Sequence, residues 1–433
     1  MGLKTSTVIA LSLLLQANLC LDPVLAKISQ ADLDKARILH GLGEGGENQF
    51  IEDKLKLGKD KNEWNEILAL NGLCWGHVKE GDRTFNAARD FARAEPTNPR
   101  ALATFALVLA YLQKRDVSLK LSQKALELDP KNARALAAQA YAVGSQGGEQ
   151  ELAKELISRA IKLAPKDREV NSVAYRLYQK LLEDMAAEEA LTRIIKNSPN
   201  DATAYNQRAW YYKDLRDFKS SIEDCKRALA INPNYEPALV LLGRMLHHAE
   251  RWQEAIVAYN RLDALEKKRG RSIKGPSLMR RAQCFAALNQ NQKAIEDYSK
   301  MLKESSPEHD GNVFSKSAMH MNKSSKEDYI QSWTARSQLY AKTGQLDRAI
   351  KDSTSLLAVF PKNPTGLHER SRLLQKAGKY EQALKDVEVL ISIDPDVALW
   401  YRTKVDILKK MGRTEEAKRF ERETNSLEKF GIK

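Results

Sequence analysis

Prolines recur along this sequence at a nearly constant interval of 34 residues. The prolines at positions 130, 165, 199 and 233 are separated by 35, 34 and 34 residues, and those at 361 and 395 are again 34 apart. A fixed period of this length is typical of solenoids, in which each repeat is one supersecondary unit that packs on its neighbours. The interval therefore predicts an array of repeats, rather than the two or three globular domains usual for 433 residues.

The stretch from Ala202 to Tyr235 shows what one repeat contains. Three residues at helical spacing share one face of a first helix, namely Tyr205, Ala209 and Tyr212. Three small residues share one face of a second helix, namely Ser221, Cys225 and Ala228. Pro233 lacks a backbone N–H and ends the second helix. The stretch predicts a helical hairpin with small residues where the two helices cross.

This pattern resembles the tetratricopeptide repeat, a 34-residue helix–turn–helix with small residues at its eighth, twentieth and twenty-seventh positions and a proline near its thirty-second. The resemblance covers most of residues 63–425. It implies an all-α fold, a right-handed α-solenoid of about nine to ten helical hairpins with one inserted loop. The expected parts are an N-terminal array at 63–304, a polar inserted loop at 305–328, and a C-terminal array at 329–433 that ends in a charged capping helix. The first hairpin of the N-terminal array matches the repeat pattern poorly.

The N-terminus has the pattern of a secretory signal peptide at residues 1–26. Lys4 is followed by the apolar run VIALSLLL at 8–15 and by small residues at Val24 and Ala26, which predicts cleavage after Ala26. The protein is therefore expected to be exported, to a periplasm or to the exterior, with no membrane span after cleavage. A lipid anchor at Cys20 and an uncleaved N-terminal anchor are the alternatives. A flexible lead-in follows at 27–62.

Catalytic motifs are missing from the sequence. The GLGEGG run at 41–46 matches the G-x-G-x-x-G motif of dinucleotide-binding folds, but it lacks the strand before it and the helix after it that the motif requires. We therefore interpret it as a linker. His309 and His320 lie in the polar inserted loop, where a metal site is disfavoured. The sparse cysteines at 74, 225 and 284 do not form a disulfide framework. We expect no enzyme activity, no cofactor, no metal and no small-molecule substrate.

The formal net charge is +13, which favours acidic partners. In the family, first helices line a concave groove through positions two, five, nine, twelve and thirteen. Carried onto this chain, these positions give the expected partner-binding residues Asn206, Trp210, Arg244, His248, Arg280, Lys342, Arg372, Lys376 and Arg402. The first repeats contribute apolar residues instead, namely Ala103, Leu107, Ala110 and Tyr111. The groove is thus expected to be apolar towards the N-terminus and basic towards the C-terminus, with Arg372 and Arg402 in solvent.

The resemblance and the charge predict a non-catalytic scaffold that binds an acidic peptide or protein in this groove. The family's carboxylate clamp, which grips the C-terminal carboxylate of a partner, is absent because Asn206 and Trp210 stand where Lys and Asn are needed. The alternative is a binder of an anionic polymer, either a cell-envelope polymer or nucleic acid. Nucleic acid is disfavoured, since the basic stripe has few aromatic residues on which bases could stack.

Overall fold

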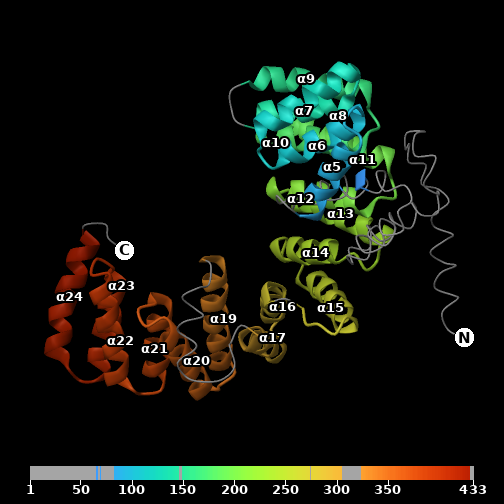
Figure 1. The fold of residues 1–433 in the computed structure, drawn as a ribbon. Helices are drawn as coiled ribbons and strands as arrows, with labels where there is room; N and C mark the ends of the chain where they lie inside the picture. The colour runs from blue at the N-terminus through green and yellow to red at the C-terminus, as the bar shows by residue number, and fades with distance from the viewer. Residues whose placement is uncertain are drawn as a thin grey trace, which may run out of the picture. The chain divides into compact units, whose positions relative to one another are not determined.

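A computed structural model gives the fold of the protein (Figure 1). It describes residues 65, 66, 69, 82–145, 149–273, 275–304 and 323–429. The predicted signal peptide at 1–26 and lead-in at 27–62 lie outside the described residues, as does the inserted loop from 305 to 322. The sequence predicts a loop that continues to residue 328, but residues 323–328 belong to a helix that begins at Lys323, so the predicted loop is too long at its C-terminal end.

The described residues form 19 helices that pair as hairpins, which confirms the all-α fold of tetratricopeptide-repeat type. Nine complete hairpins follow α5, and in each the earlier helix is here called the first helix and the later one the second helix. Tertiary contacts divide the chain into an N-terminal unit, Met1–Leu242, and a C-terminal unit, Gly243–Lys433.

The N-terminal unit contains α5 (Arg83–Ala94) and four hairpins. Their helices are α6 (Pro99–Tyr111), α7 (Arg115–Leu128), α8 (Ala133–Gly144), α9 (Gln150–Leu163), α10 (Arg168–Lys180), α11 (Asp184–Asn197), α12 (Ala202–Asp214) and α13 (Phe218–Ile231). The first helices α6, α8 and α10 contact one another in sequence. The boundary between the units falls inside α14 (Glu236–His248).

The C-terminal unit continues the same arrangement from α14 onwards. Its other helices are α15 (Trp252–Lys268), α16 (Gly275–Ala287), α17 (Asn291–Glu304), α19 (Lys323–Lys342), α20 (Leu346–Val359), α21 (Pro364–Lys376), α22 (Tyr380–Ile393), α23 (Ala398–Lys410) and α24 (Thr414–Lys429). The first helices α16, α19 and α21 are again in contact.

Several first helices begin at a side-chain cap. Asn98, Asn132 and Asp167 each accept a hydrogen bond from a backbone N–H in the first turn of the following helix, at 2.9 to 3.0 Å. Such side-chain oxygens satisfy donors that have no partner inside the helix. These caps therefore help to fix where α6, α8 and α10 begin.

Small residues let the two helices of a hairpin approach closely, as predicted. In the α12–α13 hairpin the Ser221 hydroxyl donates to the carbonyl of Ala209 at 2.8 Å, and both residues are completely buried. Serines 118, 337 and 371 make the same cross-helix bond in other hairpins, at 2.8 to 3.2 Å. A larger side chain at either position would separate the backbones and break this bond.

A buried ion pair joins the helices of four hairpins. Each pair links the Arg and Asp side chains through two hydrogen bonds, and the residues are Arg208–Asp224, Arg281–Asp297, Arg336–Asp352 and Arg370–Asp386. The partners are always 16 residues apart and, in the other hairpins, the corresponding positions are not an Arg–Asp pair. In the last hairpin Lys404 instead packs on the Phe420 ring, 4.1 Å from its centroid. The 16-residue spacing of these arginines and aspartates can be seen in the sequence, but the spacing alone does not predict that they form ion pairs.

In eight of the nine hairpins, the turn between the two helices contains one residue with positive φ. In the described part of the chain, glycine takes this place at 344, 378 and 412, whereas residues with side chains take it at 113, 182, 216, 250 and 289, with φ of 57° to 61°. A side chain in this region costs on the order of 1 kcal/mol through contact of Cβ with the backbone. The five turns that carry a side chain at this position are therefore more strained than the three that carry glycine.

We expect Leu182→Gly to raise the free energy of unfolding by about 0.5 to 1 kcal/mol. Leu182 is 84% exposed, so its removal costs no packing. Leu181→Gly is the matched control, because Leu181 has a negative φ and packs against the core, and it should destabilise the protein. Urea unfolding measures the stability of both variants. An unchanged or lower unfolding midpoint for Leu182→Gly would show that the backbone at Leu182 is not strained.

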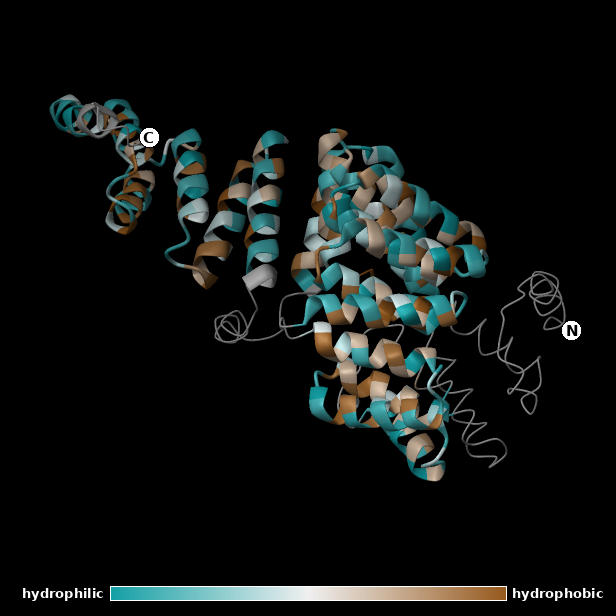
Figure 2. Ribbon diagram, turned by 90° about the horizontal axis from the view of Figure 1, so that it is seen from above, coloured by the Kyte–Doolittle hydropathy of each residue, from teal (hydrophilic) through white to brown (hydrophobic). Residues whose placement is uncertain are grey.

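Figure 2 shows that the helices carry hydrophobic and hydrophilic residues together, as expected for helices buried on one side only. Within the described residues, no helix combines the length and the apolar character that a bilayer crossing requires.

Candidate functional site

The predicted basic residues of the C-terminal unit lie on its first helices. We define the basic face as Arg244, His248, Arg280, Lys342, Arg372, Lys376 and Arg402. His248, Lys342, Lys376 and Arg402 are exposed, and the three other arginines are half-buried. These residues come from α14, α16, α19, α21 and α23, so the face extends over five consecutive hairpins of the C-terminal unit.

At the α14 end, the structure brings several of these residues together. The His247 imidazole stacks edge-on against His248 and Trp252, with ring centroids 5.7 and 5.2 Å apart. Burial lowers the pKa of His247, and the charges of His248 and Arg280 lower it further. His248 of α14 and Arg280 of α16 therefore both disfavour the charged form of His247.

Two other predicted residues are engaged with their neighbours. The Lys342 ammonium donates to the Asn289 side chain at 2.9 Å, which ties α19 to the preceding hairpin. Arg372 donates two hydrogen bonds to Glu369, the shorter at 2.6 Å, and its side chain is 39% exposed against 7% for Glu369. Arg372 was expected in solvent, and its side chain is partly exposed but also neutralises a buried carboxylate.

In the N-terminal unit, the two predicted residues differ in accessibility. Trp210 is 37% exposed and lies under the Lys213 ammonium, 4.5 Å from its ring. Asn206 is only 6% exposed, so it is a core residue rather than an accessible groove residue. Its side-chain Oδ1 atom is buried and has no hydrogen-bond partner among the described residues.

The expectation of an apolar N-terminal groove needs correction. Ala103, Leu107 and Ala110 are at most 1% exposed and belong to the core. Near them, two cations stack on aromatic rings: Arg176 on Tyr111 and Lys180 on Tyr141, each at 4.8 Å. Arg176 and Lys180 stand at the ninth and thirteenth positions of α10, so the family's groove positions applied to this repeat would have found them.

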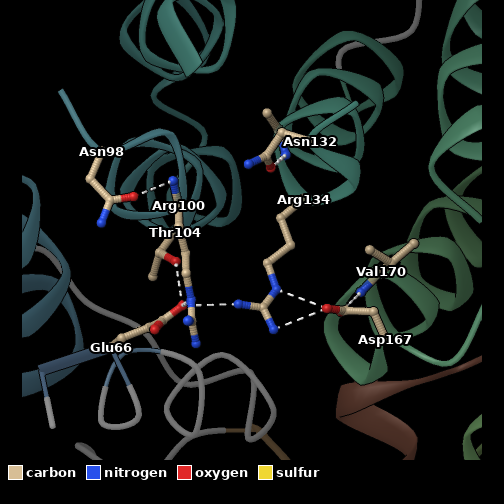
Figure 3. Close-up of polar contacts among 9 residues, drawn as sticks. Glu66, Asn98, Arg100, Thr104, Asn132, Arg134, Asp167 and Val170 are labelled. Carbon is tan, nitrogen blue, oxygen red and sulfur yellow. Dashed lines mark hydrogen bonds and ion pairs between the residues drawn. The ribbon is translucent and has the colours of Figure 1, made fainter. Parts of the chain in front are cut away.

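A cluster of ion pairs between repeats was not predicted from the sequence. Figure 3 shows the Glu66 carboxylate between Arg100 and Arg134, which donate to it at 2.7 and 2.9 Å. Arg134 also pairs with Asp167 at 3.0 Å, and Arg168 pairs with Asp201 at 2.9 Å. The signal was available, because residues 66, 100, 134 and 168 are spaced by 34. These contacts join successive repeats and leave little charge unpaired, so the cluster is structural.

The described residues offer no support for a catalytic or metal centre. No cluster of three or more histidines, cysteines and acidic residues suited to a metal ion occurs among them. Cys225 and Cys284 are buried thiols, and burial raises the pKa of Cys284 to about 12. A thiol with a raised pKa is a poor nucleophile at neutral pH. His309 and His320 lie outside the described residues.

Comparison with solved structures finds several repeat proteins of low sequence identity. YrrB, described as a TPR protein with an unusual peptide-binding site, shares 16% identity, with 50% of this chain and 99% of YrrB covered and a TM-score of 0.40. The TPR domain of P58(IPK) shares 14% identity, with 82% and 99% covered and a TM-score of 0.26. The Naa15/Naa10 structure bound to HypK-THB shares 14% identity, with 85% and 64% covered and a TM-score of 0.33.

No curated protein matches this sequence significantly. Residues 202–235 match the family described as tetratricopeptide repeat, and they coincide with the α12–α13 hairpin from which the repeat was inferred. Together with the paired helices of both units, this match shows that the chain contains a tetratricopeptide repeat within an array of helical hairpins.

Proposed function

We propose that the protein is a non-catalytic scaffold whose basic face binds an acidic peptide or an acidic segment of a protein. Tetratricopeptide-repeat proteins usually bind peptides or proteins and usually lack catalytic activity. The observation that carries the proposal is the basic face itself, where His248, Lys342, Lys376 and Arg402 are exposed on four of the five first helices that contribute to it. Cations in a row favour a partner with negative charges along an extended segment.

An anionic polymer is the second candidate, because a row of cations would attract it as well. The aromatic residues near the basic face give it little support. The ring of Tyr401 lies 6.4 Å from that of Phe420, and Tyr401 is half-buried, so it offers a poor platform for stacking bases. We therefore favour the acidic peptide.

Charge reversal at Lys376 and Arg402 tests the proposal. Both side chains are exposed, so Lys376→Glu with Arg402→Glu should preserve the fold and reduce partner capture about tenfold or more. Arg372 is unsuitable, because a glutamate there would face the buried Glu369 carboxylate. Affinity capture from the protein's own cell, followed by quantification of co-purified proteins, measures the effect.

Lys300→Glu with Lys385→Glu is the matched control. Both lysines are exposed in the C-terminal unit, but they lie on second helices, and the change in net charge is identical. This variant should capture partners as well as the unmodified protein does. Equal losses in both variants would show that only net charge matters, and undiminished capture by the Lys376/Arg402 variant would exclude the basic face.

We further propose that the protein is exported, on the support of the basic, apolar and small-residue pattern of residues 1–26. N-terminal sequencing of the protein recovered in the same capture experiment should read from Lys27. A first residue at Cys20 would indicate a lipid anchor instead.

A further inference from the structure

A pocket of about 670 Å³ lies between the second helix α9 and the hairpin that follows it. It is lined by residues of α9, by Tyr178 of α10 and by Glu183 of the turn between α10 and α11. No residue of the basic face contributes to this lining. The pocket is therefore a separate surface, and all of it belongs to the N-terminal unit.

The charge of the pocket is mainly negative. Its lining includes three glutamates, Glu151, Glu155 and Glu183. The lysine of the lining, Lys154, is already paired, because its ammonium lies 2.6 Å from Glu183 and 3.4 Å from Glu151. Glu155 is exposed and has no hydrogen-bond or ion-pair partner among the described residues. The lining thus keeps an excess of negative charge, in a protein whose formal net charge is +13.

Three large apolar side chains are exposed in the pocket and next to it in the chain. Leu152 lines the pocket and is 44% exposed. Leu182 precedes Glu183 and Met185 follows it by two residues, and these two side chains are 84% and 89% exposed. Single exposed apolar residues are ordinary, but a group of them rimmed by polar residues is typical of an interaction site. A methionine in such a group can adapt its shape to a partner.

Leu182 is an unusual residue for its position. At the other positive-φ positions of the described hairpin turns, the residues are glycine or a polar residue, namely Gln113, Arg216, Glu250 and Asn289. Leu182 has a φ of 58°, which is rare for a bulky side chain, and its exposure shows that no packing compensates for the strain. Strained residues of this kind cluster at functional sites. Leu182 therefore lowers stability within the free protein, and a binding role accounts for its presence.

We propose that this pocket, together with Leu182 and Met185, binds a basic and apolar segment of a partner protein. Arginine or lysine side chains of the segment pair with Glu155 and Glu183, and its apolar side chains cover the exposed leucines. Because the net charge of the whole protein repels a cationic segment, binding here depends on local complementarity and not on long-range attraction. The scaffold thus offers a second surface, for a partner of the opposite charge to the one proposed for the basic face.

The test uses the full-length protein and a fluorescein-labelled octapeptide of four leucines and four arginines. Two further peptides isolate the two kinds of contact, one with serine in place of leucine and one with glutamine in place of arginine. Fluorescence anisotropy should show that the leucine–arginine peptide binds about tenfold more tightly than either of them. Equal binding of the leucine–arginine and serine–arginine peptides would overturn the proposal, because charge alone would then explain the binding.

Two substitutions locate the binding site. Leu182→Gly should weaken binding of the leucine–arginine peptide about tenfold, and Glu155→Gln about threefold, since an exposed ion pair contributes less than a covered apolar side chain. Leu182→Gly is also expected to stabilise the protein, so a loss of binding in this variant does not arise from unfolding. Normal binding by both variants would exclude the pocket.

Gln113→Gly and Glu223→Gln are the matched controls. Gln113 is exposed and has positive φ in the α6–α7 turn, so its replacement makes the same backbone change without removing an apolar side chain. Glu223 is exposed and stands at the sixth position of α13, as Glu155 does in α9. Both variants should bind the peptide as the unmodified protein does, and losses equal to those of Leu182→Gly and Glu155→Gln would overturn the proposal.

Sedimentation velocity distinguishes a partner protein from a second copy of this chain. The unmodified protein and Leu182→Gly should have the same oligomeric state if the surface serves a partner. A dimer of the unmodified protein that Leu182→Gly converts to a monomer would show that the surface joins two copies, and the proposed partner would be overturned.

Discussion

Asp297→Ala is expected to lower the free energy of unfolding of the C-terminal unit by about 3 to 5 kcal/mol. Asp297 and Arg281 have side chains 4% and 6% exposed and share two hydrogen bonds of 2.6 and 2.8 Å. Arg281 keeps its charge in this buried place because Asp297 and Asp263 offset the effect of burial, so its pKa is raised. Removing Asp297 leaves a buried guanidinium with only the weaker contacts to Asn260 and Asp263, at 3.0 and 3.3 Å.

The double variant Arg281→Leu/Asp297→Ala should recover most of this loss. The same two positions in α14 and α15 carry Leu242 and Ala258, which are both buried, so the repeat accepts an apolar pair there. Replacing a buried ion pair by apolar residues is often nearly neutral, whereas removing one partner is not. Urea unfolding and hydrogen exchange of α16 and α17 measure both variants. A double variant as unstable as Asp297→Ala would show that the ion pair itself, and not an uncompensated charge, sets the stability.

Glu66→Ala is expected to destabilise the first repeats by about 3 kcal/mol. The Glu66 side chain is 2% exposed and accepts hydrogen bonds from Arg100 and Arg134 (Figure 3). In this variant Arg134 keeps its ion pair with Asp167, whereas Arg100 loses the only acidic partner that the structure shows for it among the described residues. In a repeat array each hairpin depends chiefly on its neighbours. Hydrogen exchange should therefore accelerate in α5 to α8 and remain unchanged in α20 to α23.

Glu66→Gln separates the charge from the shape of the side chain. The glutamine amide has nearly the same volume as the carboxylate and can still accept a hydrogen bond from one arginine. Glu66→Gln should therefore lower the free energy of unfolding clearly less than Glu66→Ala does. Equal hydrogen exchange in Glu66→Ala and the unmodified protein would contradict a stabilising role for this contact between repeats.

The helical hairpins were predictable from the sequence because their determinants are local and repeated. Pro233 and the small residues Ala209, Ser221, Cys225 and Ala228 mark the ends and the crossing of one hairpin, and the structure confirms that all four small residues are completely buried. Each determinant acts within its own 34-residue unit. The start of α19 at Lys323 was missed because its first turn is polar and shows no apolar period.

The state of individual polar residues was much less predictable. Asn206 and Arg372 occupy groove positions by their register, yet one is buried in the core and the other neutralises Glu369. A helical register states which way a side chain leaves its own helix, but not which groups on other helices meet it.

The sequence alone determined that this protein is all-α and built from 34-residue hairpins, because periodic apolar and small residues and prolines act over short distances along the chain. Only the tertiary structure decided which charges are free to meet a partner. The seventh position of a first helix holds Ala174 in one repeat and Arg281 in another, and both are buried, so the residue type did not reveal its role. Pairing and burial depend on distances between helices, and those distances arise only when the helices pack.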